Sequence, residues 1–283
     1  MEWKLVARPG VTALERFVAD HEPDAVAVSE RVRRGLFDKR LRSGGRCYYL
    51  PGEAAVYHGP GGFFAPIGLR EVTDTVRLDG VLRSLRRATG TFTRLHSIMG
   101  NRHDVELMAR AFDGVPRITI DYDLLALKWP AFPQVDRPPH PELRIVRPRP
   151  SQWRRLLHLQ MAYEVEEALL PGHRPNPSSS RASLAHSLET QHVLVATYRD
   201  EVVARVATNA RGFLGDQIGG VYTVPEWRQR GVSRWLMTSL LADLRREERH
   251  ASLFVKLDNT PARELYRSLG FVFESPFRIS YYQ

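Results

Sequence analysis

The second half of the chain switches repeatedly between helical and strand-like hydrophobic periods. Leu157, Met161 and Val165 recur at helical spacing, and Leu236 and Leu240 do so farther along. Between these rows, apolar and polar residues alternate as they do in half-buried strands. The pattern predicts strands at 142–146, 193–198, 202–209, 217–224 and 253–257, one or two strands at 271–281, and helices at 152–170, 181–190, 232–248 and 261–269.

The first half shows a similar order of elements. The predicted elements are strands at 46–50, 54–58 and 63–67 and a helix at 78–88. When the chain is shifted by 158 residues, Gly100–Met108 lies over Asp258–Tyr266. We interpret this match as a duplicated fold, in which Met108 replaces Tyr266 and residues 70–75 replace a glycine-containing loop.

A proline-rich stretch separates the two halves. Seven prolines lie between residues 129 and 150, and each fixes its own φ and lacks a backbone donor. Residues 143–146 alternate between apolar and polar inside this stretch, so we place the linker at 129–141. The chain is therefore predicted to hold an N-terminal domain at 1–128 and a C-terminal domain at 142–283.

The composition is that of an ordinary globular protein with an excess of arginine. The 283 residues carry a formal net charge of +9 and a pI near 10.0. The positive charges are spread along the chain, so a nucleic-acid partner is not favoured over a simple arginine bias. Cys47 is the single cysteine, and no histidine pair has metal-ligand spacing beside carboxylates, so we expect no metal.

The sequence contains no run of about 20 apolar residues that would span a membrane. Its N-terminus, MEWKLVARPG, has neither the charged start nor the apolar stretch of a signal peptide. We therefore expect a cytoplasmic protein with no membrane partner, present as a monomer or a homodimer.

Two junctions between predicted elements carry candidate chemistry. The first, at residues 228–233 (RQRGVS), follows a strand and opens the helix at 232–248. Glycine lets the backbone approach a ligand, and the unpaired N–H groups of a helix start suit a phosphate. The second, at residues 259–271, places Tyr266 on an apolar helix stripe. Taken singly, a surface turn and a packed core helix explain these residues better than a binding site does.

Together, and in this order, the two motifs resemble the GCN5-related N-acetyltransferase (GNAT) family. The family pattern is Arg/Gln-x-x-Gly-x-Gly/Ala, then a strand, then Asn-x-x-Ala-x-x-Leu-Tyr-x-x-x-Gly-Phe. The chain matches it at Arg228, Gly231, Asn259, Ala262, Leu265, Tyr266, Gly270 and Phe271. Ser233 stands where the family prefers glycine or alanine, and this small residue hampers close approach only slightly. The resemblance covers about residues 142–283.

The resemblance implies a fold and a donor. The fold is α/β (α+β), with a GNAT-like mixed, mostly antiparallel central sheet flanked by helices, and the first half is a degenerate second copy. The donor is acetyl-CoA (coenzyme A), with its pyrophosphate held by the loop at 229–234 and its pantetheine arm paired to a diverging strand at 221–224. Tyr266 would protonate the departing thiolate, since a tyrosine of pKa near ~10 keeps its proton at rest. The implied donor-binding residues are Tyr222, Thr223, Val224, Arg228, Gln229, Arg230, Gly231, Val232, Ser233, Arg234, Asn259, Ala262 and Tyr266.

The acceptor site is predicted from polar residues beside the helix at 152–170 and the diverging strand. Glu164 lies near the apolar stripe of that helix, where a carboxylate requires a reason. Glu164 and Asp216 are therefore candidate bases, although a solvated helix end explains Glu164 equally well. The candidate acceptor-binding residues are Tyr163, Glu164, Glu167, Asn209 and Gln217.

These features favour an N-acetyltransferase that acts on a small amine or an amino-acid-like acceptor. A protein or peptide N-acetyltransferase would require an open, extended acceptor groove instead. A non-catalytic acyl-CoA-binding regulatory module would bind the donor without a positioned base, and Tyr266 argues against it. Binding to nucleic acid with a steep salt dependence would point to a fourth, more distant class.

Overall fold

The second half folds as the hydrophobic periods predict, with small shifts at the element ends. The computed structural model describes residues 3–6, 12–35, 45–90, 94–112, 114–127, 136–170 and 172–282. The elements of the second half are β7 (Leu143–Val146), α5 (Trp153–Tyr163), α6 (Pro177–Thr190), β8 (Val193–Tyr198), β9 (Glu201–Arg211), β10 (Gly215–Thr223), α7 (Val232–Arg246), β11 (His250–Lys256), α8 (Thr260–Ser268) and β12 (Phe271–Tyr281).

The first half repeats this order of elements. Its elements are β1 (Lys4–Val6), α1 (Thr12–Asp20), α2 (Glu22–Arg33), β2 (Arg46–Leu50), β3 (Ala54–Gly59), β4 (Phe63–Ile67), α3 (Thr75–Thr89), β5 (Ser97–Asn101), α4 (Arg102–Ala109) and β6 (Ile118–Leu127). In both halves a strand and two helices precede three antiparallel strands, and the third strand pairs in parallel with the next one, as β4 does with β5 and β10 with β11. The chain therefore consists of two tandem units of one topology.

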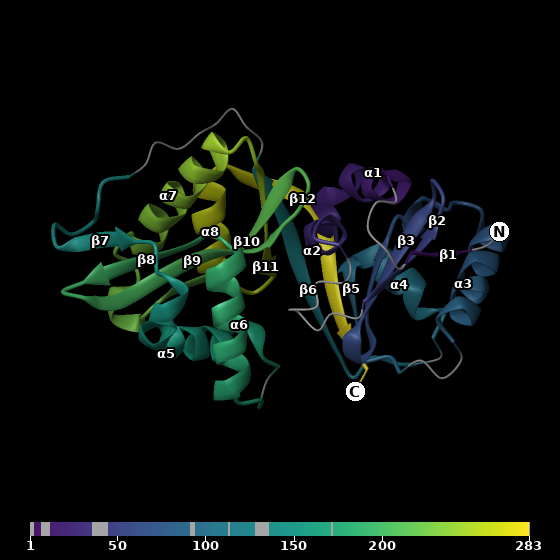
Figure 1. Cartoon of the computed structure of the whole chain (residues 1–283), viewed down its shortest axis with the longest axis horizontal. Helices are drawn as coiled ribbons and strands as arrows, with labels where there is room; N and C mark the ends of the chain where they lie inside the picture. Colours follow the sequence, from purple (N-terminus) through teal and green to yellow (C-terminus); the bar gives the residue numbers. More distant parts are fainter. Residues whose placement is uncertain are drawn as a thin grey trace.

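The two units share one sheet because they exchange strands. The described residues form a 12-stranded sheet in the order β1-β2-β3-β4-β5-β12-β6-β11-β10-β9-β8-β7. Strand β12 of the second half lies between β5 and β6 of the first, and β6 lies between β11 and β12 of the second. Figure 1 shows β6 and β12 running together at the centre of the molecule. Each half thus closes its sheet with a strand from the other.

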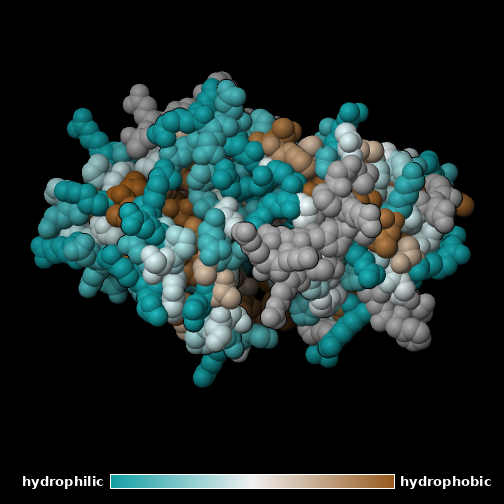
Figure 2. All heavy atoms as spheres, viewed as in Figure 1, coloured by the Kyte–Doolittle hydropathy of each residue, from teal (hydrophilic) through white to brown (hydrophobic). Residues whose placement is uncertain are grey.

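Helices cover both faces of this sheet and bury four apolar clusters. In the second half α7 and α8 pack on one face, and α5 and α6 pack on the other (Figure 1). In the first half α1 and α2 cover one face, and α3 and α4 cover the opposite one. The surface on the side drawn in Figure 2 is mainly hydrophilic, and its apolar residues gather in small groups.

Helix α2 anchors the first half to the turn between β9 and β10. The Glu22 carboxylate is 3% exposed and accepts hydrogen bonds from the backbone N–H groups of Phe213 (2.9 Å), Leu214 (3.0 Å) and Gly215 (2.6 Å). Ser29 donates its hydroxyl to the same carboxylate at 2.7 Å. Because a buried carboxylate needs such donors, this contact fixes α2 on the second half.

Two sequence predictions change at this level, and a third, of one or two strands at 271–281, is settled as one. Helix α6 starts at Pro177 rather than at residue 181, because Asn176 caps it by accepting the N–H groups of Ser178 and Ser179 (3.0 and 3.1 Å). The predicted helix at 152–170 ends in a π-helical turn at 164–168, and β12 is one strand with a register shift before Ser275. Part of the predicted linker, residues 129–135, lies outside the described residues, and the domain boundaries stay a prediction.

Candidate active site

Strands β10 and β11 diverge halfway along their length. They pair in parallel from Gly215 and His250 to Ile218 and Leu253, whereas β10 continues beside β9 as far as Thr223. An irregularity at Gly220, whose φ is +61°, accompanies the divergence. The far end of β10 therefore has an edge turned away from β11, with backbone groups available to another partner.

The loop after β10 leads into a helix start that carries no side-chain cap. Gly231 occupies the N-cap position of α7 in the left-handed conformation (φ +76°), and Gln229 also has a positive φ of 57°. The N–H of Trp235 donates to the Gly231 carbonyl at 3.0 Å, which closes the first helical turn. The N–H groups of residues 232–234 precede this bond and have no intrahelical acceptor. This arrangement suits an anionic ligand.

The three arginines of the loop point in different directions. The Arg228 guanidinium bonds both oxygens of Glu166 at 2.9 Å, and its Nε bonds the Thr223 carbonyl, also at 2.9 Å. Arg230 lies over the Trp227 ring at 5.3 Å from its centroid. Arg234 pairs with Asp136 (2.9 Å) and with the Ser268 hydroxyl (2.7 Å). Arg228 therefore faces the diverging strands, and the other two lie around the helix start.

The remaining predicted donor-binding residues lie on both sides of the divergence. The Thr223 and Ser233 hydroxyls are 2.7 Å apart, which ties the end of β10 to the first turn of α7. Tyr222 donates its hydroxyl to Glu166 at 3.0 Å, and burial together with this carboxylate raises the pKa of Tyr222. Val232 is buried in the core under α7, and Val224 is half-buried and packs against the same core.

Helix α8 presents the second motif across from this loop. Asn259 is its N-cap and accepts the N–H of Ala262 at 3.2 Å, while its Nδ2 donates to Glu167 at 3.1 Å. Tyr266 is buried one turn after Ala262, with its ring 6.0 Å from that of Phe271. Burial raises the pKa of Tyr266, and the nearby Tyr163 hydroxyl and Glu167 carboxylate raise it further. Tyr266 therefore holds its proton firmly.

The π-helical turn after α5 carries three glutamates, of which Glu166 and Glu167 lie between the diverging strands and α8. Glu166 binds Tyr222 and Arg228 as described, and Glu167 binds Asn259 and forms an ion pair with Lys256 at 3.5 Å. Glu164 instead accepts a hydrogen bond from Gln160 at 2.7 Å and another from the Ser180 hydroxyl of α6. Of the three glutamates, Glu167 is the one whose charge acts on the Tyr266 hydroxyl.

The other predicted acceptor-site residues take separate places. Tyr163 is near Tyr266, and burial raises the pKa of Tyr163. Asn209 is exposed on β9, with its amide against Gly219. Gln217 is buried and lines a small cavity beneath α2, beside Phe254. Of the predicted acceptor-site residues, the structure thus brings only Tyr163 and the glutamates of the π-turn to the neighbourhood of Tyr266.

Asp216 requires a correction. Its carboxylate is 0% exposed and is held between Arg211 (3.0 Å) and Arg249 (2.6 Å) at the beginning of β10. This end of the strand is the one still paired with β11, so Asp216 lies away from the divergence. A carboxylate fixed by two guanidinium groups is a structural ion-pair partner, and Asp216 cannot serve as the base predicted from the sequence.

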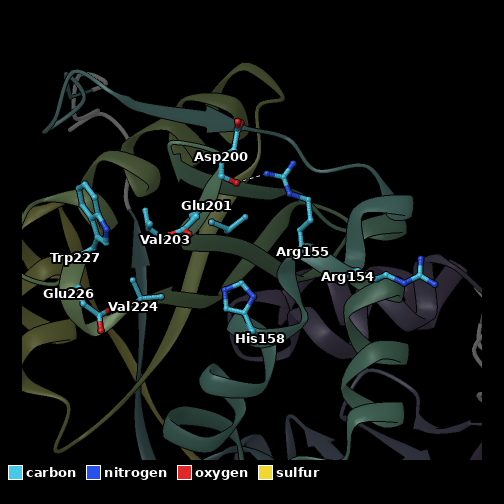
Figure 3. Close-up of a pocket in the computed structure, with 10 residues that line it drawn as sticks. Arg154, Arg155, His158, Asp200, Glu201, Val203, Val224, Glu226 and Trp227 are labelled. Atoms are coloured by element: carbon cyan, nitrogen blue, oxygen red, sulfur yellow. Dashed lines mark hydrogen bonds between the residues drawn. The ribbon is translucent and has the colours of Figure 1, made fainter.

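Two further features lie in this region. The Arg205 side chain is buried, donates to the Gln160 side chain and lies 6.0 Å from the centroid of Tyr163, and its Nε has no partner among the described residues. A cavity of about 640 Å³ opens where β9 begins and β10 ends, and Figure 3 shows His158 and Arg155 of α5 facing Val224 and Trp227 across it. The cavity reaches Val224, just after the end of β10, and Glu167 does not line it.

No metal centre or membrane segment is found in the part of the chain that the structure describes. There, no group of three or more histidine, cysteine, aspartate or glutamate residues could hold a metal ion. No helix in these same ranges is long and apolar enough to span a bilayer.

Comparison with known proteins agrees with this geometry. Residues 153–271 match the family model described as the acetyltransferase (GNAT) family. This match identifies the second half as a GNAT-type acyltransferase domain, as its two motifs indicate. A search of curated proteins gives no match.

Solved structures extend the likeness of fold to the whole chain. A Drosophila protein is 13% identical, with 99% of this chain and 98% of that one covered and a TM-score of 0.66. A GNAT-family acetyltransferase from Colwellia psychrerythraea is 8% identical over 100% of both chains, with a TM-score of 0.59. A tandem GNAT protein from the clavulanic acid biosynthesis pathway is 12% identical over 99% of this chain and 98% of that one, with a TM-score of 0.59.

Proposed function

We propose that the chain is an N-acetyltransferase that transfers an acetyl group from acetyl-CoA to a small amine or an amino-acid-like acceptor. The observation that carries this proposal is the divergence of β10 from β11 directly before the uncapped start of α7. The free edge of β10 suits the amides of a pantetheine arm, and the helix start suits a pyrophosphate. When bound, acetyl-CoA supplies an activated acetyl group as a thioester.

The residues around the divergence have separate tasks in this reaction. Glu167 holds the ammonium group of the acceptor and takes its proton, because a neutral amine is the nucleophile. Backbone N–H groups at the end of β10 stabilise the negative charge that develops on the acetyl oxygen. Tyr266 gives its proton to the departing thiolate, and its raised pKa keeps that proton available at neutral pH.

A small acceptor fits this site better than a peptide does. Glu166 and Glu167 contact Arg228 and Lys256, so the π-turn bridges the gap between the diverging strands. An extended peptide would need an open groove along this gap. The alternative, a protein or peptide acceptor, would be favoured if acetylation were observed for peptides and not for any small amine.

The proposal is tested by calorimetry with acetyl-CoA and by thiol release in an amine screen, with wild type beside Tyr266→Phe. We expect one donor site per chain, and a fall in kcat of about 100-fold or more with little change in donor affinity, which is the usual size of a general-acid contribution. Tyr48→Phe removes a similarly buried hydroxyl from β2 and serves as the control. Equal losses of turnover and affinity in Tyr266→Phe would remove its role as the acid, and absence of donor binding by wild type would overturn the function.

A further inference from the structure

The strand exchange brings a tyrosine of the first half to the candidate acceptor site. Tyr122 lies on β6, opposite Lys256 of β11 on one side and opposite Phe277 of β12 on the other. Directly opposed residues of antiparallel strands point to the same face of a sheet. Tyr122 therefore shares a face with Lys256, which bonds the Glu166 carbonyl (3.3 Å) and the Glu167 carboxylate (3.5 Å).

Tyr122 shares two of its electrostatic neighbours with Tyr266. Burial raises the pKa of Tyr122, and the nearby Tyr281 and Tyr163 hydroxyls and the Glu167 carboxylate raise it further. The last two groups act on Tyr266 as well. Tyr163 and Glu167 thus lie close to both tyrosines, one of which comes from each half of the chain.

The surroundings of Tyr122 also have an apolar side and an opening to solvent. The rings of Phe254 and Phe277 stack at 3.9 Å, and Tyr122 lies 6.4 and 6.5 Å from their centroids. Glu167 and Lys256 keep 32% and 23% of their side chains exposed. Aromatic rings beside a carboxylate suit an ammonium group that is attached to an apolar body.

We propose that β6 of the first half forms one wall of the acceptor site, and that Tyr122 contacts the acceptor next to the transferred acetyl group. This inference rests on the proposed function and adds to it a role for the first half. The acceptor class that follows is a small amine with an apolar or aromatic body.

The test uses chloroacetyl-CoA as the probe and a cysteine in place of the tyrosine. In Tyr122→Cys, the thiolate would attack the α-carbon of the bound chloroacetyl group, form a thioether and release chloride, while the thioester remains intact. Tyr282→Cys is the control, because Tyr282 is also half-buried but packs against the core under α3 and α4. The native Cys47 is fully buried, and burial raises its pKa to about 12, so we expect it to stay unmodified.

Labelling is followed by mass spectrometry and divided by the rate with chloroacetamide, which carries the same electrophile without coenzyme A. We expect this ratio to be at least about 100-fold higher for Tyr122→Cys than for Tyr282→Cys, because a bound reagent reacts as if intramolecular. Calorimetry with acetyl-CoA verifies that both variants are folded and bind the donor. Normal donor binding with equal ratios would overturn this inference alone, whereas absence of donor binding by wild type would overturn the proposed function and the inference with it.

Discussion

The two halves differ most at one equivalent place, the loop between the third strand of the triplet and the following helix. In the second half this loop ends at Gly231, and α7 begins without a side-chain cap. In the first half Asp74 caps α3 by accepting the N–H of Arg77 at 2.8 Å. The Asp104 carboxylate of α4 also accepts the N–H groups of Gly68 (3.1 Å) and Arg70 (2.6 Å).

Asp104 thus supplies the first half with an internal anion. Its carboxylate is 1% exposed and bonds the Arg70 guanidinium at 2.7 Å, while Asp24 binds the other end of that guanidinium at 2.6 Å. The loop donors that could face a phosphate are therefore already satisfied. One topology therefore gives either an uncapped helix start or a loop closed by internal hydrogen bonds, depending on whether a neighbouring helix contributes a carboxylate.

Removing the internal anion should have the largest effect. We expect Asp104→Ala to lower the free energy of unfolding by about 3–5 kcal/mol, because it leaves buried N–H groups and part of a guanidinium unpaired. Urea unfolding measures this loss, and about 50 mM inorganic phosphate should restore part of it if the loop then binds an anion. Asp79→Ala removes a charge from the exposed pair with Arg110 and serves as the control. Equal stabilities of the two variants would contradict the structural role of Asp104.

Blocking the open loop should have the next largest effect, on the donor alone. We expect Gly231→Val to weaken acetyl-CoA binding at least about 100-fold, which is roughly 2.7 kcal/mol, because a β-branched residue disfavours φ +76° and would place its side chain at the helix start where the pyrophosphate is expected. Gly52→Val is the matched control, with φ +73° in open space in the first half. Calorimetry compares the two, and an unchanged affinity in Gly231→Val would place the pyrophosphate elsewhere.

The N-cap asparagines of α4 and α8 should differ in their effect on turnover, although they stabilise their helices equally. Asn101 caps α4 by accepting the N–H of His103 at 3.0 Å, as Asn259 caps α8. We expect Asn101→Ala and Asn259→Ala each to cost about 1 kcal/mol of stability. Only Asn259→Ala should also slow turnover, because Asn259 holds Glu167. Thermal unfolding and steady-state rates separate the two effects, and equal turnover in both variants would argue against this use of Asn259.

The smallest effect concerns pH and the exchanged strands. Arg278 of β12 bonds both oxygens of Asp121 on β6 (2.6 and 2.8 Å), and this bond lowers the pKa of Asp121 below its usual 3.8. The pair therefore contributes stability above pH 3.8 that is lost as the pH falls through the lower, folded-state pKa. We expect Arg278→Gln to cost less than about 1 kcal/mol at pH 6 and less still at pH 2.5, where more of Asp121 is protonated. Urea unfolding at both pH values measures this, and a constant difference would show that packing is responsible.

Local patterns predicted the elements well and their partners poorly. Strands β4 and β8 lie where their short runs of apolar residues place them, because a buried strand records its environment in sequence. The exchange of β6 and β12 leaves no such record, since the pattern specifies a buried strand without naming its neighbours. Helix α2, which anchors the two halves, was likewise not predicted.

The candidate site shows the same limit. The two motifs were found from their resemblance to the GNAT pattern, in which Gly231 and Asn259 stand at the starts of α7 and α8. Asp216 was wrongly assigned to the acceptor site because its position beside a predicted strand does not show which end of that strand diverges from its neighbour. Glu167, rather than Glu164, raises the pKa of Tyr266, because the π-turn, closed by the N–H of Leu169 on the Glu164 carbonyl at 2.8 Å, alters the helical spacing.

The strand exchange also has a consequence for synthesis on the ribosome. Strand β5 is complete at Asn101, yet its neighbour β12 is translated only at residues 271–281. Roughly 150 residues separate β6 from the end of β12, which corresponds to about 8–30 s at ordinary elongation rates. During that interval β5 and β6 present unpaired edges, which are templates for aggregation. Nascent chains of the first half should therefore depend on chaperones until the final strand has emerged.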